Sequence, residues 1–194
     1  MMNLAVFVSG GGTNLQRIID AVDSGELQNT EIKIVIADRD CFALERSLDK
    51  GITTFLLERG KNLSQVIDEL LENQDIGLIV LAGFLSILNS EFCEKWSGKI
   101  INIHPSLLPK FGGMGMYGAR VHEAVLEAGE SVSGATVHFV TSGVDDGEII
   151  VQRTFSVEKG DTVADLQQKV MKVEQKILIE AIDKIAKKIE NSNT

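Results

Sequence analysis

Proline, cysteine and long apolar runs are all scarce in this chain of 194 residues. Proline occurs only at positions 105 and 109, and the 18 glycines are scattered, so no segment has the composition of a linker between domains. The longest uncharged apolar stretch, residues 76–88, is too short to cross a bilayer. We therefore expect one domain over residues 1–194 that has no membrane partner.

Basic residues are also fewer than acidic ones. The chain has 28 acidic and 19 basic residues and a formal net charge of −9, which opposes binding to the phosphate backbone of a nucleic acid. The two cysteines, Cys41 and Cys93, predict free thiols in a reducing compartment because two distant cysteines form no disulfide framework. Residues 1–9 lack the basic flank and the cleavage site of a secretory signal. The sequence thus indicates a cytoplasmic protein.

Apolar residues are plentiful, at 44% of the chain, and they follow two alternating periods. The pattern predicts strands over residues 3–8, 32–37, 53–56, 78–81, 99–103, 133–140 and 149–157. It predicts helices over residues 13–24, 41–50, 63–72, 90–96, 117–128 and 162–190. Such alternation is typical of an α/β domain with a doubly wound, mostly parallel twisted sheet and helices on both faces. The last two strands are joined by a short turn, so we expect an antiparallel edge near the C-terminus.

Three consecutive glycines follow the first expected strand. Gly10, Gly11 and Gly12 precede Thr13 and Asn14 at the start of the expected helix. Glycine allows a sharp turn and a close approach to a ligand, and the N-terminus of a helix attracts anions. We expect a phosphate-binding loop, although the segment matches neither the dinucleotide-binding fingerprint nor the P-loop. The alternative is an ordinary tight turn in which a hydroxyl side chain caps the helix.

The most informative segment begins at Asn102 and reads Asn-Ile-His-Pro-Ser-Leu-Leu-Pro. In a strand, Asn102 and His104 project from the same face while Ile103 points into the core, and Pro105 ends the strand. An amide that donates to a carbonyl oxygen and a histidine that moves protons suit acyl-transfer chemistry. Ser106 lacks the motif of a nucleophile elbow, so we expect its hydroxyl to cap the loop.

Two further histidines and two acidic residues are also candidates for roles in the site. We expect His122 to be a surface or partly packed residue of a helix. His138 is expected to be a buried, satisfied histidine of a strand, and the alternative is that it supports the site from behind. No two histidines have the spacing of a helical metal site, so we expect no bound metal. Asp145 and Asp146 are either simple turn residues or include the carboxylate that orients a catalytic histidine.

Four blocks of the sequence have the order found in one family. They are VSGGGTNLQ (residues 8–16), VLAGFLSIL (80–88), NIHPSLLP (102–109) and GATVHFVTSGVDDGEIIVQ (134–152). In these blocks the chain resembles the folate-dependent formyltransferases. Its segment HPSLLP is similar to that of the phosphoribosylglycinamide formyltransferases of purine synthesis. The resemblance implies the formyltransferase fold. It also implies transfer of the formyl group of the co-substrate 10-formyltetrahydrofolate to the amine of 5'-phosphoribosylglycinamide, by direct attack through a tetrahedral intermediate.

The resemblance further implies roles for individual residues. Asn102 and protonated His104 would stabilise the negative formyl oxygen, and Asp145, the first acid of the motif Val-Asp-Asp-Gly, would pair with His104 and raise its pKa. The residues implied to bind the phosphate and the ribose are Gly10, Gly11, Gly12, Thr13, Asn14 and Glu174. The residues implied to bind folate are Leu85, Ser86, Ile87, Leu88 and Asn102, with Lys61 or Arg59 at the glutamate tail.

Two features depart from the family pattern. Ser86 stands where an arginine is common, and residues 112–120 form a longer segment, rich in Gly and Met, that is either a mobile flap or a surface loop. Two other functional classes stay open. One is another folate-linked formyl enzyme, such as formyltetrahydrofolate deformylase or methionyl-tRNA formyltransferase, and the other is a nonenzymatic nucleotide-binding module. We expect small-molecule substrates, no nucleic-acid partner, and either a monomer or a homodimer.

Overall fold

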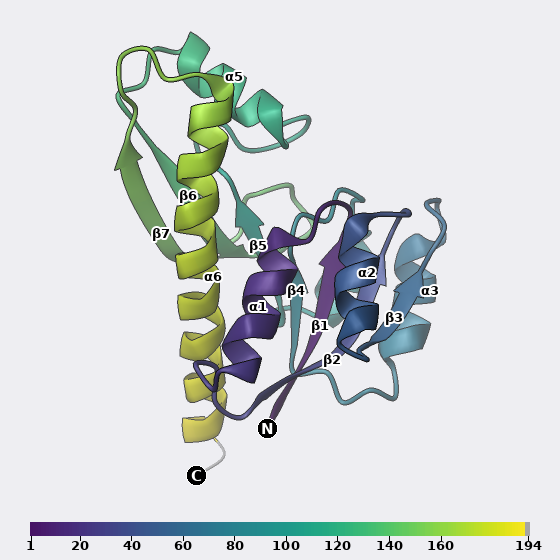
Figure 1. Cartoon of the computed structure of the whole chain (residues 1–194). Coiled ribbons are helices and arrows are strands. Elements are labelled where there is room, and N and C mark those ends of the chain that lie inside the picture. Colours follow the sequence, from purple (N-terminus) through teal and green to yellow (C-terminus); the bar gives the residue numbers. More distant parts are fainter. Residues whose placement is uncertain (193–194) are drawn as a thin grey trace.

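A seven-stranded sheet forms the centre of the protein (Figure 1). The computed structural model describes residues 1–192, so Asn193 and Thr194 of the expected domain lie outside the described residues. The strands are β1 (Met2–Val8), β2 (Thr30–Ala37), β3 (Thr53–Leu56), β4 (Leu78–Leu81), β5 (Ile100–His104), β6 (Val132–Phe139) and β7 (Ile149–Ser156). Their order across the sheet is β3-β2-β1-β4-β5-β6-β7. Strands β1 to β5 are parallel, whereas β6 and β7 are antiparallel, which confirms the predicted mixed sheet.

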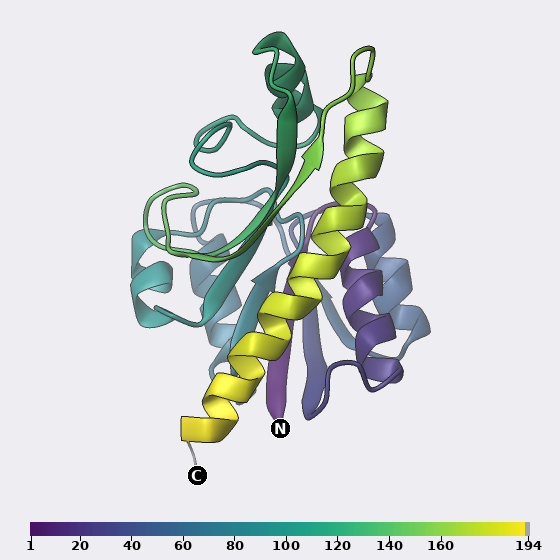
Figure 2. The same ribbon diagram turned by 90° about the vertical axis from the view of Figure 1, so that its left-hand side faces the viewer.

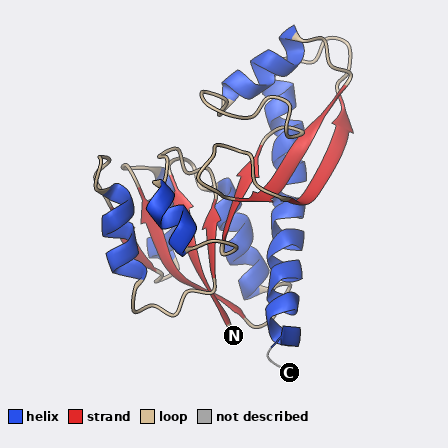
Figure 3. Ribbon diagram, turned by 180° about the vertical axis from the view of Figure 1, so that it is seen from behind, coloured by secondary structure: helices blue, strands red, loops and turns tan. Residues whose placement is uncertain are grey.

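Helices cover both faces of this sheet. They are α1 (Thr13–Asp23), α2 (Phe42–Asp49), α3 (Leu63–Leu71), α4 (Ser90–Lys95), α5 (Ala119–Glu127) and α6 (Val163–Ser192). Helices α1, α2 and α6 lie on one face, and the long helix α6 runs along the sheet (Figure 2). The opposite face, with α3 and α4, is turned to the viewer in Figure 3. None of the helices in residues 1–192 combines the length and the apolar character that a bilayer crossing requires.

Each face of the sheet buries its own apolar cluster. The cluster under α1 and α6 includes Val6 and Ile182, and the cluster under α3 and α4 includes Phe7, Ile67 and Phe92. Because successive residues of β1 point to opposite faces, Val6 and Phe7 enter different clusters and both are fully buried. Burial on both faces is the reason that these strands read as continuous apolar runs in the sequence.

The ends of the elements differ from the predicted ends by at most two residues. The difference that matters most is in β5, which includes His104 because this residue pairs with Thr136 of β6. Strands β6 and β7 and helix α5 extend beyond the ends of the parallel strands (Figure 1). Cys41 and Cys93 are free thiols, as predicted.

The strand order reverses beside β1. The chain passes from β1 to β2 on one side and later returns to β4 on the other side of β1. In open α/β sheets, ligands bind beyond the carboxyl ends of the strands at such a reversal. The glycine loop after β1 and the turn that begins at Pro105, after β5, both lie at this edge of the sheet.

Candidate active site

A cavity of about 510 Å³ opens at this edge, and its volume is in the range of small-molecule sites. With the exception of Lys61 and Arg59, every residue to which we assign a catalytic or binding role lines it. These residues are Gly10, Gly11, Gly12, Thr13, Asn14, Leu85, Ser86, Ile87, Leu88, Asn102, His104, Asp145 and Glu174. Within residues 1–192, no group of three or more His, Cys, Asp or Glu side chains is placed to hold a metal ion.

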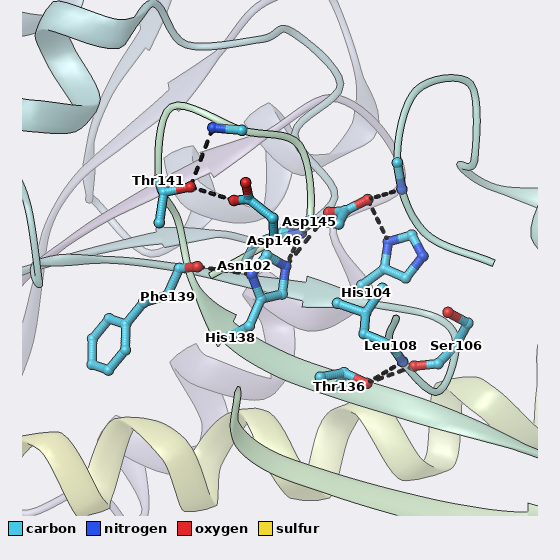
Figure 4. A network of polar contacts seen from close by, with 12 residues as sticks. Asn102, His104, Ser106, Leu108, Thr136, His138, Phe139, Thr141, Asp145 and Asp146 are labelled. Carbon is cyan, nitrogen blue, oxygen red and sulfur yellow. Dashed lines mark hydrogen bonds and ion pairs between the residues drawn. The ribbon is translucent and has the colours of Figure 1, made fainter. Parts of the chain in front are cut away.

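The alternation of side chains along β5 builds the polar end of the cavity. Ile103 packs into the apolar cluster under α6, as predicted, whereas Asn102 and His104 belong to the polar network in Figure 4. Strand β6 places His138 directly opposite Asn102. Because directly paired residues of antiparallel strands point to the same face, the side chains of Asn102, His104 and His138 converge.

Asp145 reaches these three side chains from the turn between β6 and β7 (Figure 4). Its Oδ2 accepts a hydrogen bond of 2.9 Å from the amide of Gly113 and lies 3.6 Å from Nδ1 of His104. Its Oδ1 lies 3.5 Å from Nε2 of His138 and 3.4 Å from Nδ2 of Asn102. The backbone of Asp145 has a φ of 57°, a left-handed conformation that aspartate tolerates better than most residues. One carboxylate therefore faces two imidazoles and an amide.

His104 is held from its other side by the loop that follows β5. Its Nε2 lies 2.8 Å from the carbonyl oxygen of Phe111, so this nitrogen has the hydrogen and donates it. Nδ1 of the neutral ring then has the free lone pair, and it is the nitrogen nearest to Asp145. The hydroxyl of Ser106 donates to the carbonyl oxygen of Lys110 at 2.7 Å, which confirms its predicted role in the loop. The imidazole is only 4% exposed beneath this loop.

Burial is the largest influence on the pKa of His104, and it lowers this pKa below the ordinary value. Asp145 acts to raise it, as expected, and so does the carbonyl of Phe111, but burial outweighs both. Burial also acts to raise the pKa of Asp145, but the contact with His138, the charge of His104 and the amide of Gly113 together lower it. The charge of His104 counts only where that ring is protonated. At neutral pH the pair is therefore a charged carboxylate beside a neutral imidazole.

His138 is buried and satisfied, as predicted, and it also contacts the amide of Asn102. Its Nδ1 lies 2.8 Å from the carbonyl oxygen of Phe139, so Nδ1 is the protonated nitrogen and donates. Nε2 then has a lone pair, and it accepts a hydrogen bond of 3.2 Å from Nδ2 of Asn102. This contact orients the amide of Asn102 so that its NH2 group, and not its oxygen, faces His138 and Asp145.

The glycine loop is built by close packing rather than by a capping side chain. Gly12 has a φ of 71° and begins α1 without any side-chain cap, so the alternative of a hydroxyl-capped turn is wrong. A Cβ atom at Gly12 would lie 2.7 Å from the Cβ of Ala43, so only glycine fits. The guanidinium of Arg46 donates to the carbonyl oxygen of Gly11 at 2.8 Å. Arg46 therefore fixes the loop and adds positive charge beside the N-terminus of α1.

Glu174 of α6 faces the glycine loop through Asn14. Burial raises the pKa of Glu174 to about 7, although a hydrogen bond with the side chain of Asn14 acts to lower it. The Oδ1 atom of Asn14 is buried and has no hydrogen-bond partner in the part of the chain that the structure describes. The pair therefore offers a titrating carboxyl group and a vacant acceptor, which suit the hydroxyl groups of a sugar.

Ser86, where an arginine is common in the family, is bonded to a buried carboxylate. Its hydroxyl donates to Oδ2 of Asp38 at 2.6 Å. The same carboxylate accepts two hydrogen bonds of 2.9 Å from Arg39 and lies 3.4 Å from the guanidinium of Arg59. Lys61 is exposed and does not line the cavity, so its role and that of Arg59 at a folate tail stay predictions.

The glycine-rich segment of residues 112–118 forms one wall of the cavity. The amide of Gly113 binds Asp145, and Met116 and Tyr117 line the cavity. The segment therefore orders the carboxylate that faces His104, besides covering the site. Its movement as a flap stays a prediction.

Comparison with known proteins shows the family of the chain. A family model described as formyl transferase matches residues 2–182. The chain belongs to the formyl transferase family. It is 41% identical over 189 residues to the human trifunctional purine biosynthetic protein adenosine-3, covering 94% of this chain but only 18% of the human protein. It is 37% identical to the phosphoribosylglycinamide formyltransferase of Haemophilus influenzae, covering 91% of this chain and 84% of that protein.

A solved structure of phosphoribosylglycinamide formyltransferase from Anaplasma phagocytophilum has the same architecture. Its TM-score is 0.89 at 33% identity, and the match covers 96% of this chain and 87% of that one. The predicted formyltransferase fold is thereby confirmed.

Sequence reasoning on this formyl transferase missed three features of the site. It assigned no role to the carbonyl of Phe111 or the amide of Gly113, because the residue type does not show which main-chain groups will contact a side chain. It also placed His122 at the surface or partly packed, whereas this ring is only 4% exposed. The spacing of His122 with Val125, three residues later on the same helix face, was the available signal for burial.

Proposed function

We propose that residues 1–194 act as a single formyltransferase domain that transfers the formyl group of 10-formyltetrahydrofolate to the amine of 5'-phosphoribosylglycinamide. The observation that carries this proposal is the convergence of Asn102, His104 and Asp145 at the end of β5, in one cavity with a glycine loop suited to phosphate. The relatives that bear the name phosphoribosylglycinamide formyltransferase support it.

The ribonucleotide is an anion, and the net charge of −9 does not attract it. Local donors must therefore hold the phosphate. The amides at the start of α1 have no acceptors within the helix, so Gly12, Thr13 and Asn14 would bind the phosphate there. Glu174, together with the free Oδ1 of Asn14, would accept hydrogen bonds from the ribose hydroxyls. This arrangement directs the amine of the substrate toward His104.

The folate would occupy the apolar side of the cavity. Leu85 and Ile87 line it and expose 45% and 63% of their surfaces, so together they offer apolar area that a ligand in the cavity would cover. Their peptide groups would supply the polar contacts that a pterin ring requires. The formyl group would then lie between this wall and Asn102.

In the reaction, the amine nitrogen forms a bond to the formyl carbon, and the bond from that carbon to the folate nitrogen then breaks. The amine loses one proton and the folate nitrogen gains one. The N–H of Asn102 that lies 3.4 Å from Oδ1 of Asp145 would turn to the negative oxygen and donate to it, a contribution of about 3 to 4 kcal/mol for a well-placed donor. Because His104 begins neutral, it would accept the proton at Nδ1, and Asp145 would stabilise the resulting imidazolium. No covalent enzyme intermediate is needed.

The test is a turnover assay with purified protein, 10-formyltetrahydrofolate and phosphoribosylglycinamide, followed by the absorbance of the deformylated folate. We expect turnover by the wild-type chain and its loss in His104→Ala, with affinity for the ribonucleotide retained. Release of formate in the absence of the amine would support a deformylase instead. Ribonucleotide binding without any turnover would support a nonenzymatic nucleotide-binding module.

A further inference from the structure

His122 is a buried histidine for which the proposed chemistry has no role. It belongs to α5, and only 4% of its surface is exposed. Its Nδ1 atom is buried without a partner, and across residues 1–192 neither ring nitrogen has a hydrogen bond or an ion pair with the protein. A buried polar atom without a partner lowers the stability of a protein and therefore requires an explanation.

The ring lies in the wall of the cavity. It lines the cavity together with Gly118, at the start of α5, and Gln167 and Met171 of α6, a helix against which α5 packs. Burial, and then the nearby His104, lowers the pKa of His122, so the two rings lie within electrostatic reach of each other. His122 thus lies on the side of the cavity formed by α6, where Glu174 is also found.

The chemistry of the ring restricts what it can bind. A neutral imidazole has one hydrogen-bond donor and one acceptor, so it matches a hydroxyl or an amide better than a phosphate. In the proposed complex the phosphate lies at the glycine loop and the reacting amine lies beside His104. The groups between these two points are the ribose hydroxyls and the glycinamide amide, and both are uncharged.

On the basis of the proposed function, we infer that His122 is a substrate-positioning residue whose ring nitrogen hydrogen-bonds the uncharged middle of the ribonucleotide. The nitrogen that the ligand reaches is Nε2, because Nε2 is not among the fully enclosed atoms, whereas Nδ1 is. The ligand then supplies a hydrogen bond that the protein itself does not make. The contact holds the substrate between its phosphate and its amine and takes no part in proton transfer. Ribonucleotide affinity therefore depends on this ring, whereas formylfolate affinity does not.

The test replaces His122 by leucine, which has a similar bulk and no polar atom. We expect the KM for phosphoribosylglycinamide to rise about tenfold, with kcat and the KM for 10-formyltetrahydrofolate within about twofold of wild type. Tm should stay equal or rise because the unpaired buried atom is removed. His122→Gln, which keeps a donor and an acceptor, should recover part of the ribonucleotide affinity, and it replaces the leucine variant if that variant does not fold.

Val125→Ala is the matched control, since Val125 is a buried apolar residue of the same helix. It should lower Tm without a selective change in either KM. A His122→Leu variant with unchanged ribonucleotide KM, or with equal losses for both substrates, would overturn the inference and leave His122 a packing residue.

Binding of ribose 5-phosphate, measured by calorimetry, shows whether His122 contacts a ribose hydroxyl or the glycinamide amide. It also tests the His122 contact separately from the proposed formyl transfer. Equal weakening of ribose 5-phosphate and phosphoribosylglycinamide by His122→Leu assigns the contact to a ribose hydroxyl, and selective weakening of phosphoribosylglycinamide assigns it to the amide. If the wild-type chain binds ribose 5-phosphate but transfers no formyl group to phosphoribosylglycinamide, the proposed function fails, whereas a weaker ribose 5-phosphate complex with His122→Leu still supports the contact. Absence of any ribonucleotide or sugar-phosphate binding overturns the contact as well.

Discussion

Oδ2 of Asp145 lies 3.6 Å from Nδ1 of His104, close enough for an ion pair but too far for a hydrogen bond. The same oxygen is held at 2.9 Å by the amide of Gly113. Nδ1 is unprotonated in the neutral ring, so no hydrogen is available to shorten the distance. When His104 accepts a proton, an ion pair forms without movement of the loop. The site is therefore preorganised for the charged form of His104 while burial keeps the resting form neutral.

The first prediction concerns Asp145→Asn. The charge of Asp145 raises the pKa of His104 against the effect of burial, so its removal should lower that pKa further. We expect kcat/KM to fall about 100-fold and the acidic limb of its pH profile to move to lower pH. Asp146→Asn is the matched control, because the adjacent Asp146 is bonded to the hydroxyl of Thr141 and does not face His104. An unchanged pH profile in Asp145→Asn would show that the carboxylate does not act on His104.

The periodicity of the sequence was sufficient for the sheet and the convergence of Asn102 and His104, because strand alternation is a local rule. The short turn between the last two strands was sufficient for the antiparallel edge. The pKa of His104 was not predictable to the same degree. Its burial depends on the path of the loop that brings the carbonyl of Phe111 over the ring, and no period encodes that path. The burial of His122 likewise requires the packing of α5 on α6, two helices far apart in the chain.

The second prediction concerns His138, whose Nε2 orients the amide of Asn102. His138→Leu removes this acceptor with little change in bulk. We expect kcat to fall roughly tenfold, less than on removal of an oxyanion donor itself, with the KM for the ribonucleotide nearly unchanged. His138→Gln, which keeps an acceptor, should lose less. Equal kcat values in the leucine and glutamine variants would argue that His138 only fills space.

The third prediction compares two neighbouring glycines by thermal unfolding. Gly12→Ala adds a Cβ 2.7 Å from the Cβ of Ala43 at a φ of 71°, so we expect a loss of about 1 to 3 kcal/mol. A Cβ at Gly11 meets no atom within 4 Å, so Gly11→Ala should leave Tm almost unchanged. A similar Tm loss in both variants would mean that the strain is not specific to Gly12.

The fourth prediction uses the pKa of Glu174, which burial raises from 4.5 to about 7. The folded state disfavours the charged carboxylate, so the stability contributed by the neutral form is complete below pH 4.5 and is lost as the pH rises through 7. Glu174→Gln removes this loss. In urea unfolding we expect the variant to be more stable than wild type by about 2 to 3 kcal/mol at pH 8 and nearly equal at pH 4.5. The exposed Glu180→Gln on the same helix should not reproduce this pH dependence.

The fifth prediction tests the bond between Ser86 and Asp38. The carboxylate is buried, and burial alone would raise its pKa, but Arg39 and the hydroxyls of Ser86 and Ser9 outweigh this effect and lower it. Ser86→Ala removes one donor to a buried charge, so we expect a loss of about 1.5 to 3 kcal/mol in the free energy of unfolding at neutral pH. The loss should shrink in acid as Asp38 becomes protonated, since a neutral carboxyl group depends less on the missing donor.

The same bond anchors one end of the segment that would bind folate, so Ser86→Ala should also raise the KM for 10-formyltetrahydrofolate several-fold and leave the KM for the ribonucleotide unchanged. Ser90→Ala, at an exposed position four residues later, is the matched control and should change neither stability nor KM. If Ser86→Ala were destabilised equally at every pH, the bond to the Asp38 carboxylate would not be the cause. Ser86 would then not be the residue that fixes the proposed folate-binding segment in this chain, where the family commonly has an arginine.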